Sequence, residues 1–180
     1  PDDSVCQGTT VTLLEDGGDA VSWSWSTGAH TQSIQVTSGG TYSVTIADAD
    51  GCQSSCQIVV AVYDAPTADA GVAKSFCAGS SVEIGGSPTG SGGTGPYTYS
   101  WTPIVGLNDA TVANPTASAG GTYAVRVTDV NGCWDEDSVV VTENIKPTAD
   151  AGADKSFCPD SSVQIGGSPT GSGGTGAYIY

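Results

Sequence analysis

The sequence predicts an all-β protein built from β-sandwich modules arranged in tandem. Glycine is abundant, with 26 residues among 180, and methionine is absent. Serine and threonine are frequent and long runs of helix-forming residues are missing, a composition typical of proteins with many short strands. Segments in which apolar and polar residues alternate are separated by turn residues, as in half-buried strands. The chain also repeats itself, which indicates modules in series.

The clearest repeat lies in the second half of the chain. The segment Pro-Thr-Ala-Asp-Ala-Gly at 66–71 recurs at 147–152, which is 81 positions later. Two further segments, 74–77 and 80–90, recur at the same spacing, and only one residue differs between their copies. A match of this length at a fixed spacing indicates duplicated modules.

A shorter, diverged copy opens the chain. Ser-Val-Cys-Gln-Gly at 4–8 parallels Ser-Phe-Cys-Ala-Gly at 75–79, although the first copy lacks the upstream Pro-Thr-Ala-Asp-Ala-Gly. We therefore place modules at residues 1–64, 65–145 and 146–180. The third copy stops at Tyr180, the counterpart of Tyr99, so it holds only the first strands of a module. A half-sandwich leaves sheet edges uncovered, and we expect the natural chain to continue.

Strands are expected where the alternation is strict. In the first copy these segments are 9–14, 21–25, 33–36, 42–46 and 58–62. Asp-Gly and Asn-Gly turns, within 48–51 and 129–132, predict hairpins between the last two strands of each copy. Several short strands at this spacing indicate two sheets packed as a sandwich.

The charge balance excludes several classes of partner. Lys plus Arg is 4 and Asp plus Glu is 19, which gives a net charge of −15. Because no basic patch can be assembled, we expect neither nucleic acid nor an anionic membrane surface as a partner. No apolar run reaches membrane-spanning length, and no signal peptide opens the chain.

Signals for enzymatic chemistry are missing. His30 is the single histidine, and neither a nucleophile elbow nor a zinc-protease motif occurs. The glycine-rich segment 90–95 lacks the Gly-Lys-Ser/Thr ending of a phosphate loop, and we interpret it as a flexible hairpin loop. The sequence therefore predicts a protein that is not an enzyme.

Three segments carry a family resemblance: 66–71, 97–101 and 121–133. The sequence resembles PKD-type and related immunoglobulin-like repeats. It is most similar to the cysteine-containing versions in giant surface adhesins of Bacteroidota, including gliding-motility adhesins. The resemblance implies tandem immunoglobulin-like (PKD-like) sandwiches in an extracellular protein at the cell surface, exported by the type 9 secretion route.

The leading hypothesis for function is structural. Tandem, nearly identical modules without site chemistry suit a rigid stalk or filament that displays adhesive parts away from the cell. Two alternatives stay open: a module that binds glycans or proteins directly, and an accessory region of a secreted hydrolase. The expected partners are neighbouring modules of the same chain, other copies in a filament, and surface glycans or proteins.

Six cysteines are present: Cys6, Cys52, Cys56, Cys77, Cys133 and Cys158. They form no C-x-x-C pair, and with one histidine in the chain a structural zinc site is disfavoured. Disulfide bonds formed in an oxidising compartment are the better interpretation.

Strand geometry favours disulfides that link modules. In an immunoglobulin-like sandwich the first turn and the final hairpin lie at opposite ends, ~17–20 Å apart for a typical strand. A disulfide usually spans roughly 4.4–6.8 Å between Cα atoms. We therefore expect Cys6, in the first turn of one module, to bond Cys133, in the final hairpin of the next. The competing pattern closes each module, through Cys6–Cys52 and Cys77–Cys133.

The other cysteines follow the same rule. Cys77 and Cys158 lie at first turns and are expected to pair with hairpin cysteines of later modules, beyond Tyr180. Cys52 lies at a hairpin and is expected to pair with an earlier module. Cys56 has no counterpart in the second copy, and Cys52 is the alternative partner for it.

The aromatic residues fit structural roles. Trp25 and Trp101 are expected to be the buried core tryptophans of the two sandwiches, with a sugar-stacking platform as the alternative. Tyr42 and Tyr123 are expected to have the structural role of the tyrosine found in such sandwiches. Trp134 follows the second hairpin and is expected to pack against a neighbouring module or form a contact surface.

Acidic residues near the module junction suggest a calcium site. In the expected topology one strand entry and the last hairpin share an end of the sandwich. Hard cations bind several carboxylate oxygens. The candidate ligands are Asp64, Asp69, Asp129 and Asp135. The alternative is a solvated acidic surface that binds no cofactor.

Two triplets resemble the O-glycosylation sequon of Bacteroidota. Asp-Ser-Val occurs around Ser4 and again around Ser138. An ordinary strand edge is the alternative, since three-residue matches arise easily by chance.

Overall fold

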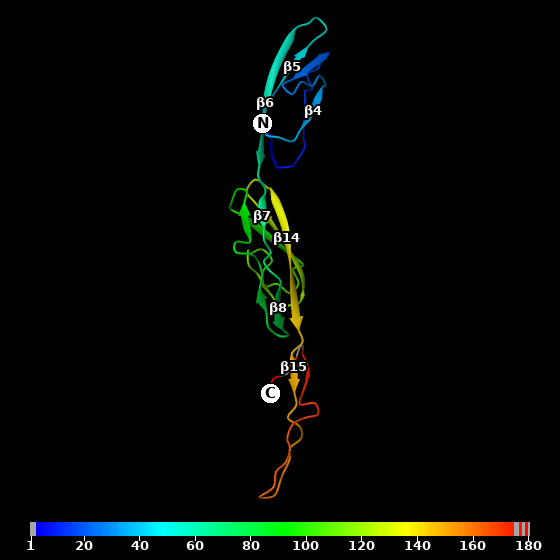
Figure 1. Ribbon diagram of the computed structural model, residues 1–180. Helices are drawn as coiled ribbons and strands as arrows, with labels where there is room; N and C mark the ends of the chain where they lie inside the picture. Colours follow the sequence, from blue (N-terminus) through cyan, green and yellow to red (C-terminus); the bar gives the residue numbers. More distant parts are fainter. Residues whose placement is uncertain (1–2, 175–176, 178, 180) are drawn as a thin grey trace. The chain divides into compact units, whose positions relative to one another are not determined.

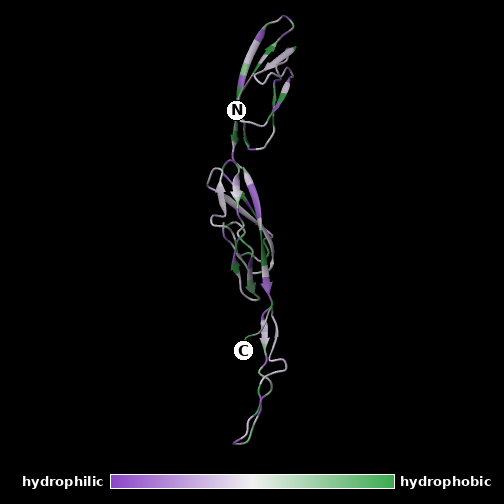
Figure 2. Ribbon diagram, viewed as in Figure 1, coloured by the Kyte–Doolittle hydropathy of each residue, from purple (hydrophilic) through white to green (hydrophobic). Residues whose placement is uncertain are grey.

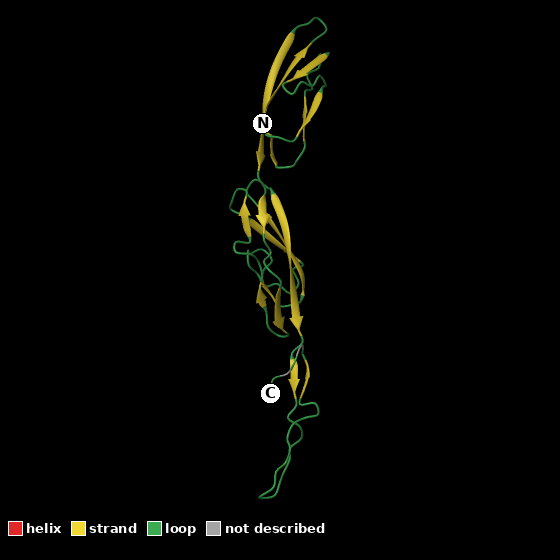
Figure 3. Ribbon diagram, in the orientation of Figure 1, coloured by secondary structure: helices red, strands yellow, loops and turns green. Residues whose placement is uncertain are grey.

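In the computed structural model the chain consists of strands joined by turns and loops (Figures 1 and 3). The structure describes residues 3–174, 177 and 179. Over that part of the chain there is no helix that could cross a membrane.

The strands follow the repeat. The first copy contains β1 (Asp3–Cys6), β2 (Val11–Leu14), β3 (Ser22–Trp25), β4 (Ser33–Val36), β5 (Gly40–Ala47) and β6 (Gln53–Tyr63). The second contains β7 (Pro66–Ala68), β8 (Lys74–Cys77), β9 (Val82–Glu83), β10 (Gly90–Gly92), β11 (Thr98–Thr102), β12 (Thr116–Ala117), β13 (Gly121–Thr128) and β14 (Trp134–Asn144). The third contains β15 (Pro147–Ala149) and β16 (Gly171–Gly173).

The first two copies share one strand order, and this order establishes the fold class. The four-stranded sheet has the order β1-β6-β5-β3 in the first copy and, in the corresponding direction, β8-β14-β13-β11 in the second. A two-stranded sheet accompanies it, β2-β4 in the first copy and β9-β12 in the second. Each copy thus carries the two-sheet arrangement of an immunoglobulin-like sandwich. The chain is an all-β protein with immunoglobulin-like modules, as the alternation of residues predicted.

By contacts the chain divides into two compact units. The first contains residues 1–68, 90–98 and 126–136, and the second contains 69–89, 99–125 and 137–180. The first unit therefore includes, besides the first copy, two short segments from the second copy. One of these segments carries the hairpin turn with Cys133, and this inclusion positions the site described below.

The core of the first unit lies between its two sheets. Six buried side chains form it: Leu13, Trp25, Ile34, Val36, Val44 and Val60. They come from β2, β3, β4, β5 and β6 at alternate strand positions, because successive side chains of a strand point to opposite faces. The alternation read from the sequence thus identified the inward face of this sandwich.

The core of the second unit is buried more completely. Ala70, Trp101 and Val125 are 0% exposed, Ile84 and Tyr123 are 1% exposed. In the last strand, buried and exposed positions alternate only in the middle section. β14 begins with hydrophilic residues and becomes hydrophobic in its middle, as Figure 2 shows. Val139 and Val141 of that middle section are each 2% exposed, whereas Val140 between them is 52% exposed.

In each of the first two copies the strand that ends at the turn cysteine pairs in parallel with the last strand, a feature that was not predicted from the sequence. β1 runs beside β6, with Cys6 opposite Tyr63, and β8 runs beside β14, with Cys77 opposite Asn144. The turn cysteine of each copy is thereby placed next to the end of that copy's last strand.

Two elements differ from the sequence-based expectation by more than two residues. β6 begins at Gln53 rather than at residue 58, because its polar first residues continue the antiparallel ladder with β5. Residues Gly90–Gly92, expected in a flexible loop, form β10 and pair antiparallel with β7. Backbone hydrogen bonds make both segments strands, and neither segment has the apolar alternation that would have indicated one.

Candidate structural site around the Cys6–Cys133 disulfide

The first half of the site is the turn that presents Cys6. β1 ends at this cysteine, and the next amide, of Gln7, donates a hydrogen bond of 2.8 Å to the carbonyl of Tyr63. The amide of Thr9 returns to the Cys6 carbonyl at 3.0 Å. Gly8 has φ +86°, a left-handed conformation that side chains disfavour, which explains a glycine at this turn.

The second half is the hairpin that presents Cys133. One carboxylate oxygen of Asp129, Oδ1, accepts hydrogen bonds from the amides of Asn131 and Cys133, both at 2.9 Å. The Asp129 amide donates to the Cys133 carbonyl at 2.9 Å, and Gly132 adopts φ +81°. An aspartate that holds the amides ahead of it fixes a tight turn, so the position of Cys133 follows from Asp129 and Gly132.

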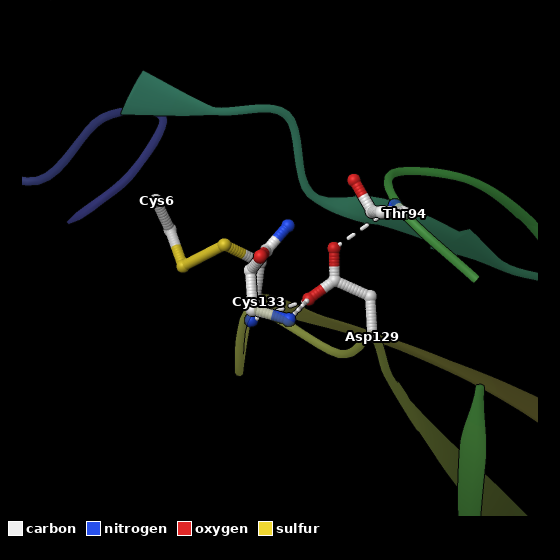
Figure 4. The surroundings of a disulfide bond; sticks show 5 residues. Cys6, Thr94, Asp129 and Cys133 are labelled. Atoms are coloured by element: carbon white, nitrogen blue, oxygen red, sulfur yellow. Dashed lines mark hydrogen bonds between the residues drawn. A yellow bond between two sulfur atoms is a disulfide. The ribbon is translucent and has the colours of Figure 1, made fainter. Parts of the chain in front are cut away.

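The two cysteines form a disulfide, with 5.5 Å between their Cα atoms (Figure 4). The bond joins positions 127 residues apart, and both residues belong to the first compact unit. It is the pair predicted from strand length, and it excludes the competing closure of each copy by Cys6–Cys52 and Cys77–Cys133. Cys133 is 0% exposed, so its sulfur is shielded from solvent.

The other four cysteines are free thiols at exposed positions: Cys52, Cys56, Cys77 and Cys158. The alternative bond between Cys52 and Cys56 is therefore not present. Cys56 lies within β6 opposite Val44 of β5, whereas Cys52 lies in the turn before β6.

The second oxygen of Asp129 connects the hairpin to the glycine-rich segment. Oδ2 accepts a hydrogen bond from the amide of Thr94 at 3.0 Å, and the amide of Val130 donates to the Thr94 carbonyl at 3.2 Å. Figure 4 shows Asp129 between Thr94 and Cys133. Gly93 fits beside them only as glycine, because a Cβ there would lie 2.8 Å from the Pro66 nitrogen and 3.0 Å from Asp129 Oδ2. The glycine-rich segment 90–95, which was expected to be a flexible loop, is thus held by Asp129 beside the disulfide.

We expect Asp129→Ala to lower the free energy of unfolding by about 3 kcal/mol. Asp129 is only 6% exposed, and its removal leaves three amides without their acceptor. Asp129→Asn should cost less, since its carbonyl oxygen can still accept the two hairpin amides while its NH₂ cannot accept from Thr94. Urea unfolding followed by circular dichroism measures both changes.

Asp48→Ala is the matched control. Asp48 Oδ1 holds the amides of Asp50 and Cys52 in the first hairpin, at 3.0 and 2.9 Å, but these contacts are exposed to solvent. Its loss should cost about 1 kcal/mol. Equal losses for Asp48→Ala and Asp129→Ala would contradict a special role for Asp129.

The carboxylates proposed as calcium ligands have other partners. Asp129 holds three amides, Asp135 Oδ2 accepts from the amide of Ala68 at 3.0 Å, and Asp69 Oδ1 accepts from the amide of Gly71 at 2.8 Å. Asp64 is exposed. No group of three metal-binding side chains occurs among the described residues. Three of these aspartates thus accept backbone hydrogen bonds, and calcium binding at the four positions stays a prediction.

Sequence reasoning missed one carboxylate altogether. Asp137 Oδ2 accepts a hydrogen bond of 2.8 Å from the amide of Ala70, which is 0% exposed. Asp135 and Asp137 lie two residues apart on β14, and so they face the same side of the strand. The two-residue spacing of these aspartates was the signal in the sequence that could have revealed their shared role. It is specific to the second copy, because the first copy has Ser54 and Cys56 at the corresponding positions.

The aromatic residues take the predicted structural roles. Trp25 and Trp101 are 6% and 0% exposed, which excludes the sugar-stacking alternative for these two side chains. The hydroxyl of Tyr42 donates to the Ser38 carbonyl at 2.7 Å, and that of Tyr123 donates to the Ala119 carbonyl at 2.9 Å. In both copies the tyrosine therefore bonds the backbone four residues upstream, as in other sandwiches of this class.

Trp134 is the aromatic residue that the structure leaves accessible. It is 50% exposed, and the guanidinium carbon of Arg126 lies 4.1 Å from the ring centroid. Arg126 also donates from Nε to Glu136 at 2.7 Å. The three side chains form a small exposed surface with an aromatic centre.

The two glycosylation candidates remain predictions. Ser138 is exposed on β14, so its hydroxyl is accessible to an enzyme. Ser4 lies in β1, and its side chain falls outside the described part of the structure.

Comparison with known proteins gives a partial likeness. No family model matches the chain. The chain is 41% identical over 91 residues to a decoration protein of Escherichia phage T5. The match covers 45% of this chain and 55% of that protein, so the chain spans about half the length of its curated relative.

Solved structures with a similar arrangement are immunoglobulin-like or adhesion proteins. The N-terminal eight immunoglobulin domains of Down syndrome cell adhesion molecule align with 82% of this chain and 24% of that one, at 16% identity and a TM-score of 0.39. A C-terminal fragment of intimin, in complex with the intimin-binding domain of its translocated receptor, aligns with 76% of this chain and 57% of that one, at 15% identity and a TM-score of 0.42. The assignment of the fold rests on strand order rather than on these low scores.

Proposed function

We propose that the chain is part of the structural repeat region, a stalk or filament, of a long extracellular bacterial surface adhesin. One observation carries the proposal: the disulfide that ties Cys6 of the first repeat copy to Cys133 of the second. Disulfides persist in oxidising compartments such as the cell exterior. A covalent bond between copies also keeps the residues that it encloses from being stretched when the array is pulled.

Three further features support this proposal. The net charge of −15 keeps such a chain soluble outside a cell. Repeat architectures supply length through successive similar units. The buried Trp25 and Trp101 and the hydrogen-bonded Tyr42 and Tyr123 have scaffold roles, as expected of a structural module. The proposal accordingly includes a non-enzymatic role.

The resemblance to Bacteroidota adhesins refines the proposal. In this proposal the chain is exported by the type 9 secretion route and lies at the cell surface. Its partners are then neighbouring modules, other copies in a filament, and glycans or proteins of the surface to which the cell attaches.

The test uses cells that carry the gene. Antibodies raised against the chain should label intact cells, and blocking thiols before lysis should preserve a peptide in which Cys6 is linked to Cys133. Labelling only after permeabilisation, with both thiols in the reduced form, would contradict an extracellular role.

A second candidate is a module that decorates the surface of a phage particle. The observation in its favour is the 41% identity to a phage decoration protein over 91 residues. Purified particles would then contain the chain, and intact cells free of phage would not be labelled.

A third candidate is direct binding of a glycan or protein. The exposed Trp134, with Arg126 over its ring, favours it because such surfaces are common at binding interfaces. Trp134→Ala should then weaken attachment of the chain to its target surface while the thermal unfolding midpoint changes little. Unchanged attachment would remove this candidate.

A further inference from the structure

We infer that the first module binds an extended, basic segment of another protein in a groove between its two sheets. The second and third copies have a segment of their own in the corresponding place, and the first copy differs from them in the residues that hold this segment. The inference goes beyond the structural role proposed above and adds a binding site to it.

The groove opens between the sheet β2-β4 and the four-stranded sheet of the first copy. Its main part is a hollow of about 530 Å³, lined by residues 12–15 and by side chains of β3, β5 and β6. The buried core residues Leu13, Trp25 and Val44 belong to this lining. A smaller hollow of about 110 Å³ shares Glu15 and Val44 with it and continues along β6. The main hollow alone falls within the range of roughly 300–1,000 Å³ that is usual for ligand sites.

The edge of β2 offers backbone groups to a strand in this groove. β2 pairs with β4, and no other strand pairs with it in the part of the chain that the structure describes. The amide of Glu15 donates to the carbonyl of Gln32 at 3.1 Å. Because bonded and non-bonded pairs alternate along an antiparallel ladder, the amides and carbonyls of Thr12 and Leu14 face the open edge. An extended peptide can therefore join β2 as a further strand.

The other two copies bind a segment of their own through a pair of glycines. In the second copy the amides of the glycines at 85–86 donate to the carbonyls of Ala70 and Asp69, at 3.0 and 2.8 Å. The third copy repeats both bonds, at 3.1 and 2.9 Å, between its glycines at 166–167 and the carbonyls at 150–151. The repeated segment Pro-Thr-Ala-Asp-Ala-Gly thus has the same attachment in both copies.

The groove of the first copy lies in the place of this segment. Leu13 and Cys56, which line the groove, are the counterparts of Ile84 and Asp137 in the second copy. There the amide of Ala70 donates to the Asp137 carboxylate at 2.8 Å, and Ala70 is 0% exposed. What fills the second copy therefore indicates what fits the first.

The segment of the second copy places small side chains inward. Pro66, Ala68 and Ala70 are buried, whereas Thr67 and Asp69 between them are exposed. A partner of the first copy is accordingly an extended segment with small side chains at alternate positions, because successive side chains of a strand point to opposite faces.

The first copy nevertheless does not suit the repeated segment itself. Leu14 and Glu15 stand where the second copy has the glycines at 85–86. The amide of Glu15 is already bonded to Gln32, so the second of the two glycine bonds has no counterpart. A Cβ on the second glycine would lie 2.4 Å from the carboxyl carbon of Asp69. The side chain of Glu15 thus excludes an aspartate at that position of an entering strand.

The charge of the groove selects a basic partner. Glu15 is half-buried and accepts hydrogen bonds from the amide of Gly17 at 3.1 Å and the indole of Trp23 at 3.4 Å. Neither lysine nor arginine lines the groove, and no basic side chain of the described residues pairs with Glu15. Asp19 and Asp48 line a further hollow along β6. A basic side chain in place of the aspartate would pair with Glu15, which disfavours another copy of this acidic chain as the partner.

Two fluorescent peptides test the inference on the chain of 180 residues. One has the sequence of residues 66–71, and the other, the lysine peptide, carries Asp69→Lys in that sequence. We expect the lysine peptide to bind roughly tenfold more tightly in fluorescence anisotropy, because a charged hydrogen bond to Glu15 replaces a repulsion. The difference should shrink at high salt, which screens a half-buried ion pair in part.

Glu15→Gln should weaken binding of the lysine peptide by roughly tenfold and remove the preference for it. Asp16→Asn is the matched control. It removes the same charge from the neighbouring residue, which is exposed and does not line the groove, so binding should not change. Circular dichroism should show that both variants keep their strands.

Amide exchange reports whether the peptide joins β2. The amide of Leu14 should exchange more slowly in the complex, because it donates to a carbonyl of the peptide as Gly85 does to Ala70. The amide of Glu15, which is already bonded to Gln32, should exchange at an unchanged rate.

Three results would overturn the inference. Equal binding of the two peptides would show that Glu15 selects nothing. Tighter binding of the unchanged sequence would show that the groove takes the protein's own repeated segment. Absence of binding, or binding without protection of the Leu14 amide, would show that no strand is added. None of these results affects the labelling of intact cells, which tests the proposed function separately.

Discussion

Reduction of the Cys6–Cys133 bond is expected to lengthen the fully stretched chain by roughly 400 Å. The bond encloses 127 residues of sequence, and an extended chain spans about 3.3–3.6 Å per residue. With the bond intact, a force applied at the two ends bypasses these residues through the disulfide, even after both units unfold. Single-molecule stretching with and without reductant measures the difference.

The control for this experiment is the variant with Cys52, Cys56, Cys77 and Cys158 all changed to Ser. Because these thiols are free, the variant should keep the short extension under oxidising conditions and lengthen after reduction as the natural chain does. The same final length with and without reductant would show that the bond does not bear load.

Trp101→Ala is expected to lower the free energy of unfolding by about 3–5 kcal/mol, the usual cost of removing a large aromatic side chain from a core. Trp101 is 0% exposed, and its indole donates to the Val112 carbonyl at 3.0 Å. Its removal leaves both a cavity and a carbonyl without that donor. Urea unfolding followed by circular dichroism checks the loss.

Trp134→Ala provides the comparison, since the same residue type is removed from a side chain that is 50% exposed. The contact with Arg126 is lost, which is worth about 0.5–1 kcal/mol at an exposed site. Similar losses for the two variants would mean that Trp101 is not the centre of its sandwich.

Local patterns predicted much of the fold. Ser33–Val36 is a strand with the predicted bounds, because its alternation of apolar and polar residues reflects one buried face. The Cys6–Cys133 pair was also predictable, because it follows from the length of one strand and from the opposite ends at which the first turn and the final hairpin of a sandwich lie.

Features that depend on contacts distant in sequence were not predictable. β10 consists of Gly-Ser-Gly and has no apolar side chain to signal burial, so its pairing with β7 left no trace in the alternation. The Asp135 carboxylate serves an amide 67 residues away, that of Ala68. Such aspartates look like cation ligands in the sequence, since their amide partners are invisible there.

The parallel strand that brings Cys6 beside the end of β6 also affects the order of assembly. Cys52 is translated 46 residues after Cys6, whereas Cys133 follows only after 127. Loop closure alone would favour the nearer thiol roughly fivefold, because closure probability falls with about the three-halves power of loop length. The first sandwich removes that advantage once it folds, since it holds Cys6 and Cys52 at opposite ends of its strands. Folding of the first copy before oxidation therefore prevents the wrong pairing, and oxidation of the unfolded chain would trap Cys6 with Cys52.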